Sequence, residues 1–340
     1  MNIMIASRFF YPSLGGSETN AEILAREFVR LGHQVKLITH TPGTKIDGYG
    51  TPFPFEVIRR PGPLQFLALV RWCDVCLQNG ILLKQVWALW LTQTPWVIRH
   101  QTWIQQPNHA ATWLTQLKLI AAKRSTSIAI SEAIAQHLHY PSIIIPNPYR
   151  DEQFRLIPEI ERTKELVFMG RLVSDKGIDL LLQAVANLKA FNLAPKLTII
   201  GSGEEEKALR QQAKALNLDA QVTFVGPKVG DELVTLLNQH HILVVPSRWH
   251  EPFGVVALEG IACGCVVVGS EGGGLKDAIG NCGITVPNGD VDALTQALAH
   301  LLEYPNEQIQ YRNNAPVHLA KHRKEAVARA YLRVLEEAIA

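Results

Sequence analysis

Two cations stand close together after a short apolar run near the middle of the chain. Arg171 and Lys176 follow the run ELVFMG and precede a segment with helical periodicity over 176–188, for which Ser174 is the expected cap. Cationic side chains beside a helix start favour phosphate, because the helix dipole adds partial positive charge there. Solvated surface charge is the alternative for such a pair taken alone. The pattern therefore indicates an anion site if other residues converge on it.

Two carboxylates follow in the segment PSRWHEPFGVVALEG. Glu251 precedes an expected helix over 254–262, and Glu259 lies inside it. Gly254 at the turn leaves the first backbone N–H groups of this helix open to a phosphate or a sugar hydroxyl. Carboxylates accept paired hydrogen bonds from vicinal diols, so we expect Glu251 to hold a sugar and Glu259 a ribose. Capping or pairing within the helix is the alternative for Glu259, but an unpaired charge on such an apolar helix is costly.

The elements that must position these residues alternate between buried strands and amphipathic helices. Runs such as NIMIA, DVCLQ and WVIRH mark the first half of the chain, and ELVFMG through CVVVGS mark the second. This alternation predicts an α/β fold with two doubly wound parallel sheets, whose ligands bind at the carboxyl ends of the strands. The proline-rich stretch 146–165 is the expected linker. We predict domains over 1–150 and 151–323, and a terminal helix over 324–340 that packs back on the first domain.

The bulk composition narrows the function classes. The net charge is +2 and no run of Lys or Arg forms a stripe, which disfavours nucleic acid as a partner. No apolar segment approaches the roughly 20 residues of a spanning helix, and the first residues lack the pattern of an export signal. Five scattered cysteines then indicate reduced thiols in a cytoplasmic protein. The pair Cys73 and Cys76 is interpreted as packing, because a zinc site needs a second ligand pair.

The motifs GRLVSDKG, PSRWHEPFGVVALEG and SEGGGLKDAIGNCGITVPNGD resemble those of glycosyltransferase family 4, also described as glycosyl transferases group 1. YPSLGGSE after the first strand is similar to the glycine loop of that family, and the Pro146-Asn147 pair is a second, separate feature that resembles the family. The resemblance implies the GT-B fold, in which two Rossmann-like domains face each other across a cleft. It also implies a retaining enzyme that moves a sugar from a nucleoside-diphosphate sugar, with UDP or GDP expected as the nucleotide, to an acceptor hydroxyl.

The resemblance assigns roles to particular residues. Arg171 and Lys176 would neutralise the donor diphosphate, Glu251 would bind sugar hydroxyls near the reaction centre, and Glu259 would bind the ribose. Backbone N–H groups for the donor would come from Phe253, Gly254 and Val255. The catalytic set would be Glu251, His100, Arg171 and Lys176. The first domain would bind the acceptor, which is a glycan, a lipid-linked molecule or a small molecule.

Three further residues in the first half are candidates. Gly15 and Gly16 precede a helix over 17–31 with Ser17 as its expected cap, and their backbone could approach a phosphate or sugar. Most such pairs are simply turns, and this one lacks the G-x-G-x-x-G spacing of a nicotinamide site. His100 ends the strand WVIRH, where doubly wound folds place ligand-binding groups. Without the resemblance, a capping or core histidine is favoured there.

Six of the seven tryptophans gather between Trp72 and Trp113. We interpret most of them as core residues and Trp103 as the acceptor contact. Aromatic residues also favour membrane interfaces, so peripheral contact of the first domain with the inner face of a membrane is left open. Arg59, Arg60, Lys123 and Arg124 could then meet anionic lipid, although surface charge is the simpler interpretation.

No metal and no bound cofactor are expected. Asp290-Val291-Asp292 mimics a metal-binding D-x-D motif, but helix capping explains it better because a helix is expected over 290–303. Lys276 and Asp277 depart from the family pattern, in which proline and glutamate are common. The competing hypotheses are a phosphorylase or a sugar-nucleotide epimerase on the same fold, and a non-catalytic subunit that binds sugar nucleotides.

Overall fold

The computed structural model describes residues 1–13, 15–43, 52–105 and 112–340, and it contains two parallel sheets. The chain divides into two units, one formed by residues 1–148 with 323–340 and the other by residues 149–322. We call them the N-terminal unit and the C-terminal unit. The boundaries predicted after residues 150 and 323 lie next to those of the structure.

The sheet of the N-terminal unit has the strand order β3-β2-β1-β4-β5-β6-β7, with every neighbouring pair parallel. The order reverses between β1 and β4. Its strands are β1 (Asn2–Ser7), β2 (Gln34–Thr39), β3 (Glu56–Arg59), β4 (Val75–Asn79), β5 (Trp96–His100), β6 (Thr126–Ala129) and β7 (Ile143–Ile144). Its helices are α1 (Gly16–Arg30), α2 (Pro63–Trp72), α3 (Leu83–Thr92), α4 (Trp113–Ala122), α5 (Glu132–Leu138) and α13 (Lys324–Ile339).

Both faces of this sheet are covered by helices, as strands buried on two sides require. Ile3 and Ile5 of β1 join one core with residues of α1 and α13, whereas Met4 and Ala6 join a second core with residues of α2, α3 and α4. This alternation follows from the two-residue period of a strand. Helix α13 therefore belongs to the N-terminal unit, where its Tyr331 is fully buried.

The C-terminal unit repeats the same architecture with the strand order β10-β9-β8-β11-β12-β13, again all parallel. Here the order reverses between β8 and β11. Its strands are β8 (Lys164–Met169), β9 (Leu197–Ile200), β10 (Val222–Gly226), β11 (His240–Val245), β12 (Val266–Ser270) and β13 (Gly283–Val286). Its helices are α6 (Ile178–Asn187), α7 (Glu206–Ala215), α8 (Gly230–Asn238), α9 (Val255–Ala262), α10 (Leu275–Ile279), α11 (Val291–Glu303) and α12 (Glu307–Ala320).

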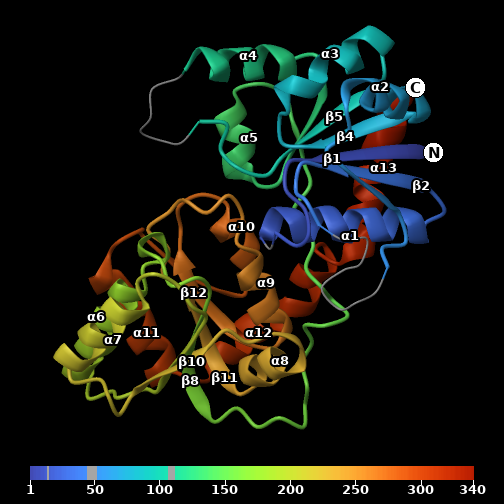
Figure 1. Cartoon of the computed structure of the whole chain (residues 1–340). Coiled ribbons are helices and arrows are strands. Elements are labelled where there is room, and N and C mark those ends of the chain that lie inside the picture. The colour runs from blue at the N-terminus through green and yellow to red at the C-terminus, as the bar shows by residue number, and fades with distance from the viewer. Residues whose placement is uncertain (14, 44–51, 106–111) are drawn as a thin grey trace. The chain divides into compact units, whose positions relative to one another are not determined.

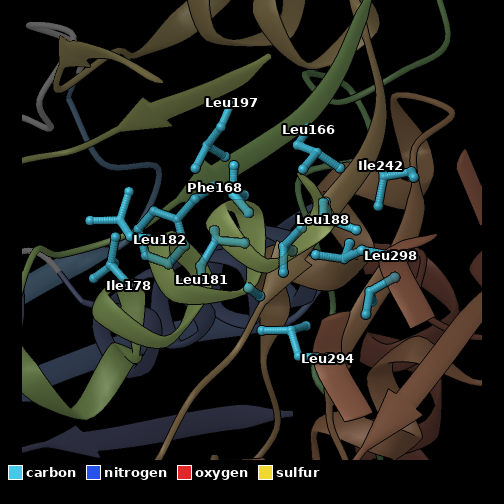
Figure 2. Close-up of a cluster of buried hydrophobic side chains, with 14 of the residues drawn as sticks. Leu166, Phe168, Ile178, Leu181, Leu182, Leu188, Leu197, Ile242, Leu294 and Leu298 are labelled. Carbon is cyan, nitrogen blue, oxygen red and sulfur yellow. The ribbon is translucent and has the colours of Figure 1, made fainter. Parts of the chain in front are cut away.

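One core of this unit fills the space between the sheet and helices α6, α7 and α11. Figure 2 shows Leu166 and Phe168 of β8 among leucines of α6 and α11, and each of these side chains is at most 2% exposed. Figure 1 shows α6, α7 and α11 grouped on the same side of the C-terminal sheet. The prediction of an α/β fold with two doubly wound sheets is confirmed.

Candidate active site

The first group of candidate residues lies where the strand order of the C-terminal sheet reverses. Arg171 and Lys176 follow β8, and Glu251 follows β11, which is the neighbour of β8 in the sheet. Loops that leave two adjacent parallel strands in opposite directions open a crevice at the carboxyl end of the sheet, where such folds bind ligands. Topology thus brings together two loops that are far apart in the sequence.

Lys176 and Glu251 form an ion pair across these two loops. The Nζ atom of Lys176 lies 2.5 Å from Oε1 of Glu251, and the hydroxyl of Ser247 donates to the same oxygen at 2.9 Å. The two charged side chains are 22% and 13% exposed, so the pair is shielded but within reach of a ligand. Among the residues that the structure describes, no partner hydrogen-bonds Oε2 of Glu251. One oxygen therefore anchors the side chain and the other is available.

The loop that carries Lys176 differs from its prediction. Ser174–Lys176 form a short 3-10 turn, and α6 begins at Ile178 with Gly177 as its cap, so Ser174 does not cap the helix. Gly177 has a φ of +67°, and a Cβ atom there would lie 2.1 Å from the carbonyl oxygen of Pro246. A glycine is needed because the loops after β8 and β11 touch at this point. This contact positions Lys176 beside Glu251.

Arg171 is not part of the ion pair. It lies two residues beyond β8 with its side chain exposed, and it has no ion pair or side-chain hydrogen bond among the described residues. Its guanidinium is therefore available to an anion at the same end of the sheet. The structure brings Lys176 and Glu251 together and leaves Arg171 near them in the fold but without contact.

Gly254 caps α9 in a conformation that favours glycine. Its φ is +99°, and a Cβ atom there would lie 2.5 Å from Cδ1 of Leu275 at the start of α10. The neighbouring Phe253 is 2% exposed, and its ring centre lies 5.7 Å from that of His322. Phe253 thus anchors the turn in the core, while Val255 is the first helical residue. The backbone N–H groups at this helix start could bind an anion, because the helix dipole adds partial positive charge there.

Glu259 lies in the second turn of α9 and is partly buried. Burial raises the pKa of its carboxyl from 4.5 to about 7, and the charge of Arg150 opposes that rise. Within the described part of the chain, the carboxylate has no ion pair or hydrogen bond. A desolvated carboxylate without hydrogen bonds is costly in free energy, which makes Glu259 a candidate ligand-binding group.

Asn288 was not predicted, yet it ties the loops of the site together. Its Oδ1 accepts from the backbone N–H of Gly272 at 2.7 Å, and its Nδ2 donates to the carbonyl of Ser247 at 2.9 Å. These bonds join the loop after β12 to the loop that holds Glu251. The sequence offered only an asparagine in a Pro-Asn-Gly turn, because side chains of turn residues are normally engaged locally.

The N-terminal unit has a second group of polar residues, again at its strand reversal. Asn79 ends β4, and its Nδ2 donates to Oγ of Ser7 and to Oγ of Ser17, each at 3.1 Å. Ser17 lies inside α1, which begins at Gly16 after Gly15, so the prediction that Ser17 caps this helix is wrong. Its hydroxyl instead serves the bond to Asn79. Neither Asn79 nor its bonds to the two serines were predicted, because the bonds join residues 72 and 62 positions apart.

Gly15 and Gly16 are not required by the packing of the described residues. A Cβ atom at Gly16 would meet nothing within 4 Å, and one at Gly15 would meet only the flexible carboxylate of Glu18. Neither glycine has a positive φ. A ligand could therefore approach the backbone at Gly16, and the role predicted for the two glycines stays a prediction.

A pocket of about 270 Å³ lies beside these residues at the carboxyl ends of β1, β4 and β5. Asn79, His100, Trp103 and Lys118 are among the residues that line it. The pocket combines an amide, an imidazole, an aromatic ring and a cation, which suits a polar ligand with an apolar face.

His100 reaches the wall of this pocket but is only 2% exposed. Its Nε2 lies 3.2 Å from both the Ser127 hydroxyl and the Tyr140 hydroxyl. Burial lowers the pKa of His100 to about 4, so the imidazole is neutral at neutral pH. A neutral imidazole can offer hydrogen bonds but no positive charge.

The metal-like motif and the cysteines have structural roles. Asp290 caps α11 by accepting from the backbone N–H of Ala293 at 2.8 Å, which confirms the capping interpretation. Cys73 and Cys76 are buried free thiols in the core beneath α2, as expected for packing residues. Across the described residues, no group of three or more His, Cys, Asp or Glu side chains could hold a metal ion.

Three tryptophans contradict the prediction that most of this cluster is core. Trp96 is 6% exposed, but Trp87 is 45%, Trp90 is 46% and Trp113 is 70% exposed. They lie on the outer faces of α3 and α4 rather than in the core that these helices cover. Helical periodicity alone did not reveal which side of each helix faces the sheet.

Comparisons with known proteins agree with this fold. Residues 150–318 match the family model described as glycosyl transferases group 1. A D-inositol 3-phosphate glycosyltransferase of Corynebacterium jeikeium is 35% identical over 185 residues, covering 52% of this chain and 44% of that protein. A glycogen synthase of Mycobacterium tuberculosis is 31% identical over 218 residues, covering 61% of this chain and 52% of that protein. The chain thus spans about half the length of these curated relatives.

Solved structures extend the similarity over the whole chain at the level of the fold. Anabaena HepE in complex with UDP superposes with a TM-score of 0.82 at 20% identity, covering 99% of this chain and 100% of that one. The sucrose-phosphate synthase of Thermosynechococcus elongatus superposes with a TM-score of 0.77, also at 20% identity, covering 99% and 98%. These likenesses confirm the GT-B fold.

Proposed function

Because this chain belongs, through residues 150–318, to the glycosyl transferases group 1, we propose that it transfers a sugar from a nucleoside-diphosphate sugar to an acceptor hydroxyl with retention of configuration. The observation that carries the proposal is the ion pair of Lys176 and Glu251 at the strand reversal of the C-terminal sheet. Curated glycosyltransferases that match 52% and 61% of the chain support it.

The donor diphosphate would be held by charge. Lys176 uses one of its three N–H donors on Glu251, which leaves two for phosphate oxygens, and Arg171 is free to add a second cation. Helix α9 begins after Gly254, in the connection that follows β11, so its first backbone N–H groups lie at the carboxyl end of the sheet. Such preorganised donors stabilise charge that builds on a leaving phosphate, by about 2.7–4 kcal/mol each.

The two carboxylates would hold hydroxyl groups. Oε1 of Glu251 is occupied by Lys176 and Ser247, so Oε2 is the atom that we assign to a sugar hydroxyl. Glu259 would accept from the ribose, which would replace the hydrogen bonds that its carboxylate lacks. UDP or GDP is the proposed nucleotide. The Anabaena HepE structures, which hold UDP or UDP-glucose, support a nucleotide-sugar donor.

In the proposed reaction the acceptor hydroxyl attacks the anomeric carbon from the face that the phosphate leaves. The bond from that carbon to the phosphate oxygen breaks, the bond to the acceptor oxygen forms, and the acceptor proton passes to the departing phosphate. The arginine and lysine compensate the negative charge of the nucleoside diphosphate. This route needs no covalent intermediate with the protein.

The acceptor would bind in the pocket of the N-terminal unit, lined by Asn79, His100 and Trp103. The proposal includes a glycan, a lipid-linked molecule or a small molecule as the carrier of the hydroxyl. Peripheral contact of this unit with a membrane is part of it, because a lipid-borne acceptor must be met at a bilayer surface. No helix in the described part of the chain is long and apolar enough to span a bilayer.

The decisive experiment combines a binding screen with product analysis. We expect UDP or GDP and the matching sugar nucleotide to raise the melting temperature of the protein, because a ligand of the native state stabilises it by mass action. Lys176→Ala should abolish transfer while the chain remains folded. Lys214→Ala, an exposed lysine at the end of α7, is the matched control and should behave as wild type.

Three results would point elsewhere. Full transfer by Lys176→Ala would remove the role assigned to this lysine. Sugar 1-phosphate formed with inorganic phosphate, or an epimerised sugar nucleotide formed without acceptor, would identify a phosphorylase or an epimerase. Donor binding without hydrolysis or transfer to any acceptor would identify a non-catalytic subunit.

A further inference from the structure

The outer faces of α3 and α4 carry an unusual concentration of exposed apolar side chains. These two helices contribute seven of the eighteen large hydrophobic residues that are exposed in the described part of the chain. We call these seven the tryptophan face; they are Trp87, Trp90, Leu91, Trp113, Leu114, Leu117 and Ile120.

The members of the tryptophan face lie on two helices that contact each other. Trp87 and Leu91 are one turn apart on α3, and Trp113, Leu117 and Ile120 recur at helical spacing along α4. The guanidinium carbon of Arg124, just beyond α4, lies 5.1 Å from the centre of the Trp90 ring, which joins the two helices at that end. Figure 1 shows α3 and α4 next to each other on the outside of the N-terminal unit.

The opposite faces of the same helices pack against the sheet of the N-terminal unit. Val86 and Leu89 of α3 and Ala121 and Ala122 of α4 are buried in the core over the sheet. The residues of the tryptophan face are therefore not part of that core. Contiguous exposed apolar surface of this kind marks an interaction site in soluble proteins, because leaving it in water is unfavourable.

The charge of this region is strongly one-sided. From 57 to 131 the sequence has one acidic residue, Asp74, and eight Lys or Arg residues, whereas the whole chain has 31 acidic and 33 basic residues. Lys84 at the start of α3 and Lys123 just after α4 are both exposed. A binding partner should therefore have an apolar surface that covers the tryptophan face and negative charges that pair with the lysines at the ends of the two helices.

We propose that the tryptophan face docks on a lipid bilayer that contains anionic headgroups. Tryptophan is suited to the boundary between headgroups and acyl chains, because its ring is apolar and its N–H group is polar. Each helix has 10 residues and is about 15 Å long, too short to span a bilayer, so both would lie in the plane of the interface. Lys84, Lys123 and Arg124 would bind lipid phosphate or carboxylate groups.

This inference rests on the proposed function and deepens it. Docking on a bilayer would bring a lipid-linked acceptor to the pocket of the N-terminal unit. Lys118 belongs both to α4 and to the lining of that pocket, so the docking helix and the proposed acceptor site share an element. Membrane docking and donor binding involve different residues. An experiment can therefore show that one of the two proposals is wrong while the other holds.

The test is sedimentation of the full chain with vesicles of phosphatidylcholine alone and with 30% phosphatidylglycerol. We expect binding to the anionic vesicles with a blue shift of tryptophan fluorescence, and weak binding to neutral ones. Leu117→Ser with Ile120→Ser should weaken binding by about tenfold or more, because two apolar side chains leave the bilayer. Lys84→Gln with Lys123→Gln should weaken it by about fivefold per charge and reduce its sensitivity to salt.

The control carries Ile309→Ser and Val317→Ser on α12, which are 52% and 72% exposed in the C-terminal unit, and should bind vesicles as wild type does. All variants should show the wild-type melting temperature and the wild-type melting shift with UDP or GDP, since these report on the fold and the donor site. Absence of binding to anionic vesicles, or equal binding by the Leu117 and Ile120 variant, would overturn the proposal. A concentration-dependent dimer that this variant abolishes, without vesicle binding by wild type, would instead identify an interface between copies.

Discussion

Lys176 and Ser247 contact the same carboxylate oxygen of Glu251, although Lys176 and Glu251 lie 75 residues apart in the chain. This arrangement sets the orientation of Glu251 before any ligand arrives. A preorganised carboxylate loses little freedom on binding, which makes its remaining oxygen a more effective hydrogen-bond acceptor. The predictions below test this site and the groups that support it.

Ser247→Ala should reduce kcat/KM for the donor by about tenfold or more, because a hydrogen bond to a charged group contributes about 1.5–3 kcal/mol. The side chain of Glu251 would keep Lys176 but lose its second anchor. Steady-state kinetics with varied donor would measure the effect. Thr223→Ala removes an exposed hydroxyl from β10 of the same unit and should leave kcat/KM unchanged. Unaltered kinetics in Ser247→Ala would show that this bond does not orient Glu251.

In the absence of ligand, the Glu259→Gln variant should be more stable than the wild type at high pH. It should also bind the nucleotide more weakly. Burial raises the pKa of Glu259 to about 7, so the native state holds a proton that the unfolded chain releases near 4.5. The stability that this proton provides is present below pH 4.5 and is lost as the pH rises through 7. The variant should therefore melt above wild type at pH 8, and the difference should shrink towards pH 4.5.

The same variant separates structure from binding. Calorimetric titration with UDP and GDP at pH 8 should show weaker binding by Glu259→Gln, because the amide is a poorer acceptor for ribose hydroxyls than a carboxylate. Wild-type affinity in this variant would contradict the ribose role. A lower melting temperature at pH 8 would contradict the desolvated carboxylate.

Gly254→Ala should lower both stability and donor affinity. Alanine is strained at a φ of +99°, and its Cβ atom would clash with Leu275, so the start of α9 must shift. Gly32→Ala is the matched control, since its φ is +92° and no atom lies within 4 Å of the added Cβ. We expect each variant to lose about 1 kcal/mol or more of unfolding free energy. Only Gly254→Ala should also lose affinity for the nucleotide, measured as a smaller melting shift.

His100→Asn should reduce the loss of stability on acidification. Burial lowers the pKa of His100 to about 4, so between pH 6.5 and 4 the unfolded chain takes up a proton that the native state does not. Native stability falls with pH across this window, and the variant lacks that contribution. Urea unfolding at pH 7 and pH 4.5 would measure it. Replacing the exposed His40 by Asn should leave the pH dependence as in wild type; an identical dependence in His100→Asn would show that this imidazole is not desolvated.

Periodicity in the sequence was sufficient to predict most elements of the C-terminal unit. The expected helices over 254–262 and 290–303 are found as α9 (Val255–Ala262) and α11 (Val291–Glu303). Helix α12 was not predicted, because Pro316 lies inside it and only Gln308 is buried, which leaves no apolar stripe to detect. The motifs around Lys176 and Glu251 also predicted the family that residues 150–318 match.

Only the tertiary structure decided how these residues act. Periods of two and 3.6 residues are local properties that neighbouring side chains encode, so strands, helices and short motifs can be predicted from the chain itself. Which oxygen of Glu251 is occupied, why His100 is neutral and why three tryptophans face outward all depend on contacts between distant segments. Burial and charge act through space, and the sequence alone does not specify those distances.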